Sequence, residues 1–422
     1  MKKENGLFEF IEKSPTAYHT VAEIKRRLLQ CGFSEISERD SSAFSGERCF
    51  VIRDSSIIAF KKKKLDGGFM ICATHGDSPA FKVKGTKGSA GDYLGLSTET
   101  YGGLIYYSWL DRPLSLAGRV AVETKDGIEM RLFNFERDVA VIPSLAIHMN
   151  RTVNDGVKLN PAKDLLPLLS LDGDADIKSL LADELSVKKE EIVSHDVFLY
   201  SRENPRAFGM DGEFILSPRI DDLACVYTSL EAFVEAEPIG VSVLCVFDNE
   251  EVGSATKQGA GSTFLHDTLL RIAGSKEKYL EMLSDSFMVS ADNAHAKHPN
   301  YPECSDPDNA PVLGGGVVVK YNANQRYATD ARSDAIFRTI CKRIDLSLQS
   351  YLNRADMPGG STLGSIADTK VGISTVDIGI AQLAMHSSSE VAALSDISDM
   401  QKAMAAVYSA SIVADKDEIR IM

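Results

Sequence analysis

The sequence has few cysteines, few histidines and no long apolar run, and each shortage excludes a class of protein. Its seven cysteines form no CxxC pair and several lie in apolar runs, so we expect reduced, buried thiols rather than a cysteine-based zinc site. No stretch is long enough to span a membrane, and the first residues, MKKENGLFEFIEKSP, lack the apolar core of a signal peptide. We therefore expect a cytoplasmic protein with no membrane partner.

Basic residues are outnumbered by acidic ones. The chain has 46 Lys and Arg against 60 Asp and Glu, which gives a formal net charge of −14. Such a surface repels phosphate backbones, so nucleic acid is not an expected partner. At 422 residues with 44% apolar residues, the chain exceeds the size that one hydrophobic core usually supports, and two domains are expected.

Short apolar runs that end in Gly, Asp or Asn alternate with helical patterns, which is typical of α/β proteins. Because these runs do not alternate with polar residues, they suit strands buried on both faces of a sheet. The expected strands lie within 67–77, 241–251, 286–293 and 316–322. The expected helices are 222–233, 334–344, with Ile344 on its apolar face, and about 398–414, which includes Ile412.

The segment 86–214 differs from the rest of the chain. It has Gly-rich turns, an expected strand pair within 116–133 and a charged stretch at 183–196. We interpret it as a smaller β-rich domain inserted into a discontinuous domain formed by residues 1–85 and 215–422.

Acidic residues cluster where the expected strands end. Asp248, Glu250 and Glu251 follow one run, Asp292 follows another, and Asp221 and Asp222 open a helix. Any one of these could simply cap a helix or form a turn. Capping explains the whole set poorly, because like charges crowded at one sheet edge repel one another unless cations lie among them.

Two of the eight histidines stand out by their position. His75 opens HGDSP after an apolar run, and His386 ends QLAMH. Each alone would more often be structural. Together with the acids they form a ligand set that suits zinc, manganese or cobalt. Two divalent ions about 3.5–4 Å apart could activate a bridging water. Because neighbouring side chains at a strand end can point in different directions, Glu250 and Glu251 could divide the roles of base and ligand.

These residues resemble a known family, the M18 metallopeptidases or aspartyl aminopeptidases. The resemblance runs in order through nearly the whole chain, in the blocks 10–21, 74–84, 101–120, 142–151, 217–223, 248–254, 290–301, 320–330 and 382–387. It implies a zinc-peptidase α/β fold, with a central mixed sheet between helices, interrupted by the β-rich insertion. It also implies a homo-oligomer built from dimers, up to a tetrahedral dodecamer, that releases N-terminal residues from peptides.

The resemblance also implies a role for each residue of the site. Two divalent ions per subunit, zinc before manganese or cobalt, would be bridged by Asp221 and completed by Glu251 with His386 and by His75 with Asp292. Glu250 would be the general base, and Asp77 would orient His75. His148 would reach the active site of a neighbouring subunit.

Substrate choice rests on fewer residues. Lys320 matches a lysine that helps relatives accept Asp or Glu side chains, with His295 and Tyr327 in the same region. Alternatively, Lys320 pairs with a protein acid or reaches solvent. Ser389 stands where relatives have an arginine, which weakens either the acidic preference or the pairing that holds that loop. A broad or neutral aminopeptidase, a carboxypeptidase or deacylase with the same metal core, and a catalytically silent assembly protein are the alternatives.

Overall fold

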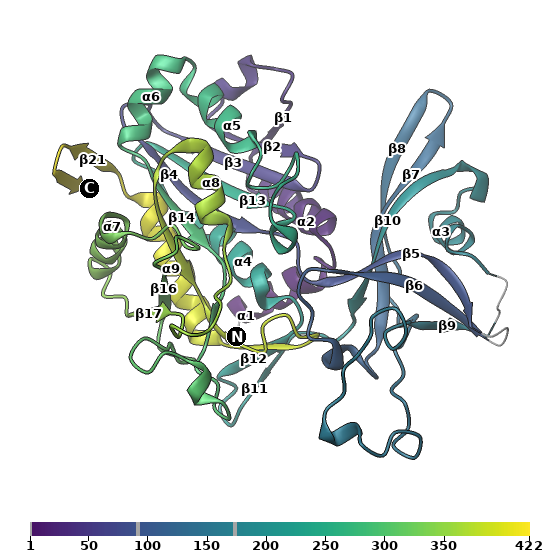
Figure 1. Ribbon diagram of the computed structural model, residues 1–422. Coiled ribbons are helices and arrows are strands. Elements are labelled where there is room, and N and C mark those ends of the chain that lie inside the picture. The colour runs from purple at the N-terminus through teal and green to yellow at the C-terminus, as the bar shows by residue number, and fades with distance from the viewer. Residues whose placement is uncertain (1, 90–92, 172–174) are drawn as a thin grey trace.

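The structure is a computed structural model that describes residues 2–89, 93–171 and 175–422. Its largest element is a nine-stranded mixed sheet in the order β1-β2-β3-β13-β4-β14-β18-β16-β17 (Figure 1). These strands are β1 (Ser34–Ile36), β2 (Arg48–Arg53), β3 (Ser56–Lys62), β4 (Phe69–His75), β13 (Val241–Phe247), β14 (Phe287–Ala291), β16 (Val317–Tyr321), β17 (Leu348–Leu352) and β18 (Ser374–Gly379).

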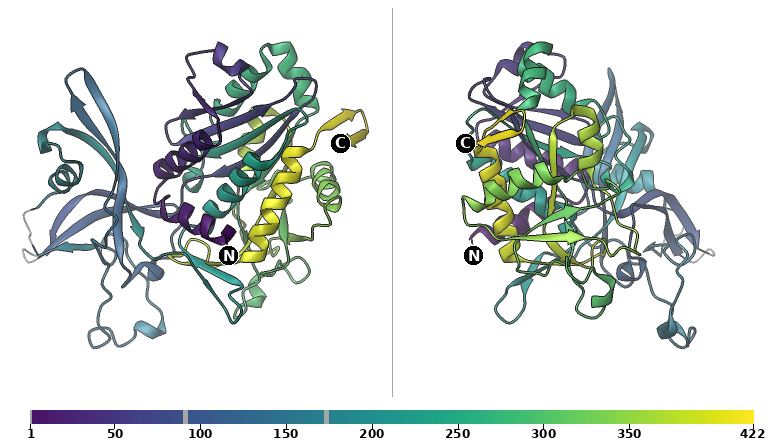
Figure 2. Two further views of the ribbon diagram at one scale, coloured as in Figure 1. Left: turned by 180° about the vertical axis from the view of Figure 1, so that it is seen from behind. Right: turned by 60° about the vertical axis from the view of Figure 1, so that its left-hand side comes forward.

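Helices cover both faces of this sheet, and each face has its own apolar core (Figures 1 and 2). One core contains side chains of α1 (Lys2–Glu12), α2 (Ala17–Gln30), α4 (Ile220–Glu235), α7 (Ala331–Lys342) and α9 (Leu394–Ser409). The other contains side chains of α5 (Phe264–Ala273), α6 (Lys276–Ser284) and α8 (Leu363–Val371). The expected α/β fold with a central mixed sheet between helices is confirmed.

The register of three parallel strands brings their carboxyl ends to one edge. β13 pairs with β4 so that Phe247 lies opposite His75, and β14 pairs with β4 so that Ser290 lies opposite Ala73. The residues that follow β13 and β14 therefore emerge beside His75. This edge is where open α/β sheets place their functional groups.

A second, six-stranded sheet lies beside the first and has a separate core (Figure 2). Its strands are β8 (Gly127–Asn134), β7 (Leu114–Thr124), β10 (Ile192–Ser201), β5 (Ala80–Ser89), β6 (Tyr93–Tyr101) and β9 (Leu168–Ser170), and α3 (Ile177–Leu185) packs on it. The sheet begins at Ala80, so the expected boundary at 85/86 falls inside β5. The division into two domains stays a prediction.

Two smaller sheets complete the fold. A five-stranded sheet contains β11 (Arg206–Phe208), β12 (Phe214–Ser217), β20 (Glu390–Ala393), β19 (Ala381–Leu383) and β15 (Ala294–His295). A terminal hairpin consists of β21 (Ile412–Asp415) and β22 (Glu418–Ile421), which projects from the end of α9 (Figure 1).

Several expectations about local structure need correction. The last helix ends at Ser409, and Ile412 pairs with Ile421 in the terminal hairpin, because Ile412 and Val413 favour a strand before the turn at 416–417. Helix α7 ends at Lys342, so Ile344 lies beyond it and is exposed. All seven cysteines are free, but Cys31 and Cys304 are exposed rather than buried.

Within residues 2–89, 93–171 and 175–422, no helix combines the length and the apolar character needed to cross a bilayer.

Candidate metal centre

Five side chains from separate elements converge at the carboxyl edge of the large sheet. His75 is the last residue of β4, Asp221 lies in the first turn of α4, and Asp292 directly follows β14. Glu251 lies in the 3₁₀ turn η5 (Glu250–Val252) after β13, and His386 lies in the loop between β19 and β20. The structure thus brings together all five expected metal ligands.

The carboxylate of Asp221 lies between the two imidazoles. Its Oδ1 is 3.4 Å from Nε2 of His75, and its Oδ2 is 3.4 Å from Nε2 of His386. On the first side, His75 Nε2 is 3.7 Å from Oδ1 of Asp292. On the second side, His386 Nε2 is 3.5 Å from Oε2 of Glu251. One carboxylate therefore faces two separate His and acid pairs.

The ligand atoms are close enough to share metal ions. Three groups have donor atoms within 4.8 Å of one another: His75, Asp221, Asp222 and Asp292; His75, Glu250 and Glu251; and Asp221, Glu251 and His386. Asp222 stands out in the sequence as an acid that opens a helix, but the sequence does not indicate that it belongs to the first group. Its Oδ2 accepts the backbone N–H of His75 at 3.2 Å.

The electrostatics of the cluster show strong mutual dependence between the acids and the imidazoles. Burial alone would lower the pKa of His75, but the carboxylate of Asp221 that faces it and the charge of Asp222 raise it above its ordinary value. Burial would also lower the pKa of His386, but the neighbouring carboxylate of Asp221 raises this pKa to about 10. Burial raises the pKa of Glu250 to about 8, although His75 opposes this rise. Several buried acids thus need positive charge beside them.

Asp77 supports the site from behind. Its backbone oxygen is 3.1 Å and its Oδ1 is 3.4 Å from Nδ1 of His75. Its carboxylate also accepts the backbone N–H groups of Glu250 and Glu251, both at 3.2 Å, and the hydroxyl of Tyr101 at 2.7 Å. Asp77 therefore contacts both the imidazole and the turn that carries the two glutamates.

The loop of His386 is held by groups that sequence reasoning did not assign. Oε1 and Oε2 of Glu390 accept the backbone N–H groups of His386 and Asp221, at 2.7 and 3.0 Å. Nδ1 of His386 is 2.9 Å from the carbonyl oxygen of Gly103. Beside it, Gly102 has φ of +74°, and a Cβ there would lie 3.1 Å from Cβ of Glu251, so this close approach requires glycine. In the sequence, the feature that could have indicated this role of Glu390 is its position as an acid four residues after His386.

Lys320 is buried and bonded to protein acceptors. Its Nζ donates to the carbonyl oxygen of Asp292 at 2.7 Å, to that of Asn293 at 3.3 Å and to Oδ2 of Asp292 at 3.4 Å. It also lies 5.0 Å from the ring centroid of Tyr327, which is buried. His295 is near the same region, with its ring 6.1 Å from that of Tyr351. Of the alternatives left open for Lys320, pairing with a protein acid is what the structure contains.

Two other residues of interest lie apart from the cluster. His148 is exposed in the segment between β8 and β9, so this protomer does not bring it to its own metal ligands. The hydroxyl of Ser389 donates to Glu203 at 2.5 Å, and Arg112 pairs with the same acid at 2.7 Å. Arg112 therefore supplies a guanidinium to an acid that Ser389 contacts.

Comparisons with known proteins agree with this geometry. The model of the aminopeptidase I zinc metalloprotease (M18) family matches residues 10–408. This chain belongs to the M18 family. A probable M18 family aminopeptidase 2 of Clostridium novyi is 41% identical over 415 residues, which cover 94% of this chain and 96% of that protein.

Solved structures of relatives share the fold. A chain in the cryo-EM structure of the Ape4 and Nbr1 complex has a TM-score of 0.91 and 34% identity, over 96% of this chain and 85% of that one. The mApe1 dodecamer of S. cerevisiae has a TM-score of 0.83 and 25% identity, over 96% of this chain and 95% of that one. The M18 chain described here is therefore a metallo-aminopeptidase.

The residues present fit zinc. Imidazole nitrogen and carboxylate oxygen are both common zinc ligands, and catalytic zinc sites combine them with an open position. Oδ1 of both Asp221 and Asp222 is buried without a hydrogen-bond donor among the described residues, although each acid lies inside the cluster. Buried carboxylate oxygens without donors are costly, and a bound cation removes that cost.

Proposed function

We propose that this M18 enzyme is a dinuclear zinc aminopeptidase that prefers peptides with N-terminal Asp or Glu. The observation that carries the two-ion part is the position of Asp221, whose oxygens face His75 and His386 on opposite sides. His75 and Asp292 would hold one ion and His386 and Glu251 the other, with Asp221 shared between them. Manganese or cobalt would fit the same ligands.

Bound divalent ions would supply Lewis-acid chemistry, lowering the pKa of a water and polarising the scissile carbonyl. Glu250 would perform the proton transfers. Its carboxyl lies in the same cluster as His75 and Glu251, and Asp77 holds its backbone N–H in place. Glu250 would take a proton from the attacking water and deliver it to the departing amine. The metal-ligand, base and orienting roles of these residues are all part of the proposal.

The adjacent glutamates provide a matched test. Glu250→Gln should leave the zinc content unchanged, because Gln keeps the size of the side chain, and should lower kcat roughly 10²–10⁴-fold. Glu251→Gln should instead lower the zinc content, because it removes a charged ligand. Zinc is measured by elemental analysis and kcat with aminoacyl chromogenic substrates. Equal loss of zinc in both variants, or near-normal kcat in Glu250→Gln, would contradict the assignment.

The acidic preference rests on the charge of Lys320 beside the Asp292 side of the site, together with Tyr327 and His295 as neighbours. A broad or neutral specificity is the second candidate. Lys320 also supports a broad or neutral specificity, because its ammonium group already donates to three protein oxygens and therefore does not need a substrate carboxylate. We propose that an acidic substrate side chain is attracted by this buried charge.

Lys320→Met separates the two candidates. If Lys320 attracts the substrate side chain, kcat/KM should fall far more for Asp and Glu substrates than for Leu and Ala substrates. If Lys320 only positions Asp292, all four substrates should lose activity equally and zinc binding should weaken. A panel of these substrates, with free and blocked N-termini, is run on zinc-loaded protein.

Self-association is the last part of the proposal. The segment between β8 and β9 exposes apolar side chains around His148, including Leu145, Ile147 and Met149, of which Met149 is 77% exposed. Exposed apolar groups of this kind mark protein interfaces. Together with the dodecamer known for the yeast relative, they support dimers that assemble into a tetrahedral dodecamer, with His148 reaching a neighbour's active site. The cytoplasmic location stays a prediction from the sequence.

A further inference from the structure

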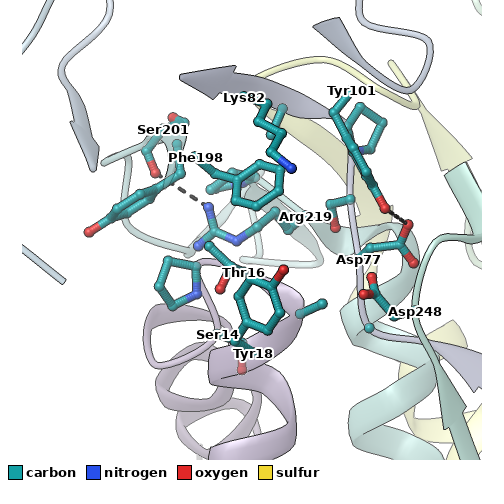
Figure 3. Close-up of a pocket in the computed structure, with 18 of the residues that line it drawn as sticks. Ser14, Thr16, Tyr18, Asp77, Lys82, Tyr101, Phe198, Ser201, Arg219 and Asp248 are labelled. Carbon is teal, nitrogen blue, oxygen red and sulfur yellow. Dashed lines mark hydrogen bonds between the residues drawn. The ribbon is translucent and has the colours of Figure 1, made fainter. Parts of the chain in front are cut away.

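A cavity of about 240 Å³ lies between the two large sheets and the start of α2 (Figure 3). Its walls include Asp77 and Asp221, so it adjoins the metal centre. None of the other expected metal ligands lines it, nor does Glu250. The cavity therefore shares Asp77 and Asp221 with the metal centre but extends away from the other four expected metal ligands.

Arg219 is the unusual residue of this cavity. It is half-buried at the N-cap of α4, two residues before Asp221, and its Nε is buried. Its Nη2 donates to the carbonyl oxygen of Ile11 at 3.1 Å, and its Nη1 donates to that of Ser201 at 3.4 Å. A guanidinium has five N–H groups, so these two bonds leave three N–H groups, including that of Nε, without a protein acceptor among the described residues.

The charge of Arg219 also lacks a direct counter-ion. No acid of the described chain forms an ion pair with it. Cζ of Arg219 lies 5.5 Å from the ring centroid of Tyr200, and Glu390, which also lines the cavity, accepts the N–H groups of Asp221 and His386. By contrast, Lys82 and Arg119 on the opposite wall both pair with Asp196, at 3.0 Å. Arg219 is thus a half-buried cation that lies near an aromatic ring but forms no ion pair with a carboxylate among the described residues.

Other unsatisfied donors line the same cavity. The hydroxyl of Ser14 and the indole Nε1 of Trp109 are both buried, and neither has a hydrogen-bond partner among the described residues. Figure 3 shows the guanidinium of Arg219 among the labelled side chains of the cavity, above Thr16 and Ser14 and beside Ser201. Thr16 is the N-cap of α2 and caps it with no side-chain bond, so backbone N–H groups at this helix start add positive potential.

We propose that this cavity binds a small carboxylate, held by the guanidinium of Arg219 and the hydroxyl of Ser14. A carboxylate matches the planar fork of a guanidinium, and the free edge of Arg219 that includes Nε–H offers two parallel donors. The cavity volume accommodates a molecule of a few heavy atoms, larger than a halide ion and smaller than a peptide. Either a simple organic acid or a free amino acid would carry the required group.

The two donors can be tested separately, with a matched control. Ser14→Ala removes a hydroxyl that has no hydrogen-bond partner among the described residues, so it should leave thermal stability without ligand unchanged. Ser115→Ala removes another buried hydroxyl without a partner in the described part of the chain, but Ser115 does not line the cavity. Arg219→Met keeps an unbranched side chain of about the length of the aliphatic stem of Arg and removes the guanidinium with its charge. Because Arg219→Met also loses two backbone contacts and could fail to fold, Ser14→Ala keeps the proposal testable alone.

The measurement is calorimetric titration of zinc-loaded protein with acetate, glycine or chloride, at an ionic strength held constant by a sulfonate too large for the cavity. Acetate should bind the unaltered protein and Ser115→Ala equally. Its Kd should rise roughly three- to tenfold in Ser14→Ala and more than tenfold in Arg219→Met. Binding of glycine with the same dependence identifies amino acids as ligands, whereas binding of acetate alone identifies simple acids.

Three results would overturn the proposal. Acetate affinity unaffected by Ser14→Ala would place the anion elsewhere, for instance on the zinc. Equal weakening by Ser14→Ala and Ser115→Ala would reflect a general effect of hydroxyl removal. Chloride binding as tight as acetate would indicate a site for spherical ions rather than for carboxylates. Since none of these readouts is peptidase activity, they are independent of the proposed function.

Discussion

Asp77→Asn tests how much the support behind the ligands contributes to the metal centre. The carboxylate of Asp77 offers two anionic oxygens to four groups. Oδ1 accepts Glu250 N–H and faces His75 Nδ1, while Oδ2 accepts Glu251 N–H and the Tyr101 hydroxyl. Asn retains only one oxygen, and its NH₂ group would face donors.

The loss can be estimated from these contacts. At least one donor loses its acceptor, which costs about 1–3 kcal/mol, and the negative charge beside His75 disappears. About 2 kcal/mol corresponds to roughly a 30-fold change in an equilibrium constant, within the 10–100-fold range typical of groups that support metal ligands. Zinc affinity should therefore fall by about this factor, while kcat at saturating zinc falls less.

The assay is competition with a chromogenic zinc chelator, followed by kcat measured with excess zinc. Asp196→Asn serves as the control, because Asp196 lines the neighbouring cavity and pairs with Lys82 and Arg119 but contacts no expected metal ligand. Zinc affinity of Asp77→Asn within twofold of the unaltered protein, or an equal loss in Asp196→Asn, would refute the supporting role of Asp77.

Two further predictions concern stability and assembly. Burial lowers the pKa of His19 to about 4, whereas the pKa of a histidine in the unfolded chain is near 6.5. The folded protein therefore binds this proton more weakly than the unfolded chain does. The free energy of unfolding should fall by about 3 kcal/mol as the pH falls from about 6.5 to 4. Denaturant unfolding of zinc-loaded protein across this range should show a shallower decline in His19→Gln, and an identical decline would contradict the prediction. Met149→Asp should reduce the oligomer size, because it places a charge in an exposed apolar segment. Analytical ultracentrifugation measures this size. Leu280→Asp changes an exposed side chain of α6 in the same way and should leave the oligomer unchanged. An unchanged oligomer in Met149→Asp would remove this segment from the interface.

The expected ligands could be found in the sequence because the physics that gathers them is local and regular. Apolar runs without alternation predict strands buried on both faces, and parallel strands end at one edge of their sheet. Polar residues at or just past the ends of β4, β13 and β14 were therefore expected to lie near one another, as His75, Glu251 and Asp292 do. The helical patterns predicted α4 for the same reason, since its apolar face repeats at helical spacing.

The groups that hold the ligands could not be found in this way. Tyr101 ends β6 of the other sheet, Gly103 follows it, and Glu390 begins β20 of a third sheet. Their contacts with Asp77 and His386 depend on how separate sheets pack, which no periodicity encodes. The partners of Lys320 posed the same difficulty: a lysine at a strand end predicts a nearby anion, but the pattern does not indicate whether substrate or protein supplies it.

These contacts between sheets also concern which part of the fold builds the metal centre and which part serves assembly. The carbonyl oxygen of Gly103 lies on Nδ1 of His386, and the Tyr101 hydroxyl donates to the carboxylate that supports His75 and both glutamates. Both groups belong to the segment expected to serve assembly. Because an imidazole ligand needs a partner on its second nitrogen to fix its orientation, this segment takes part in building the metal centre of its own subunit. Any movement of the six-stranded sheet against the large sheet would change these contacts, so assembly and metal binding are expected to be linked in this enzyme.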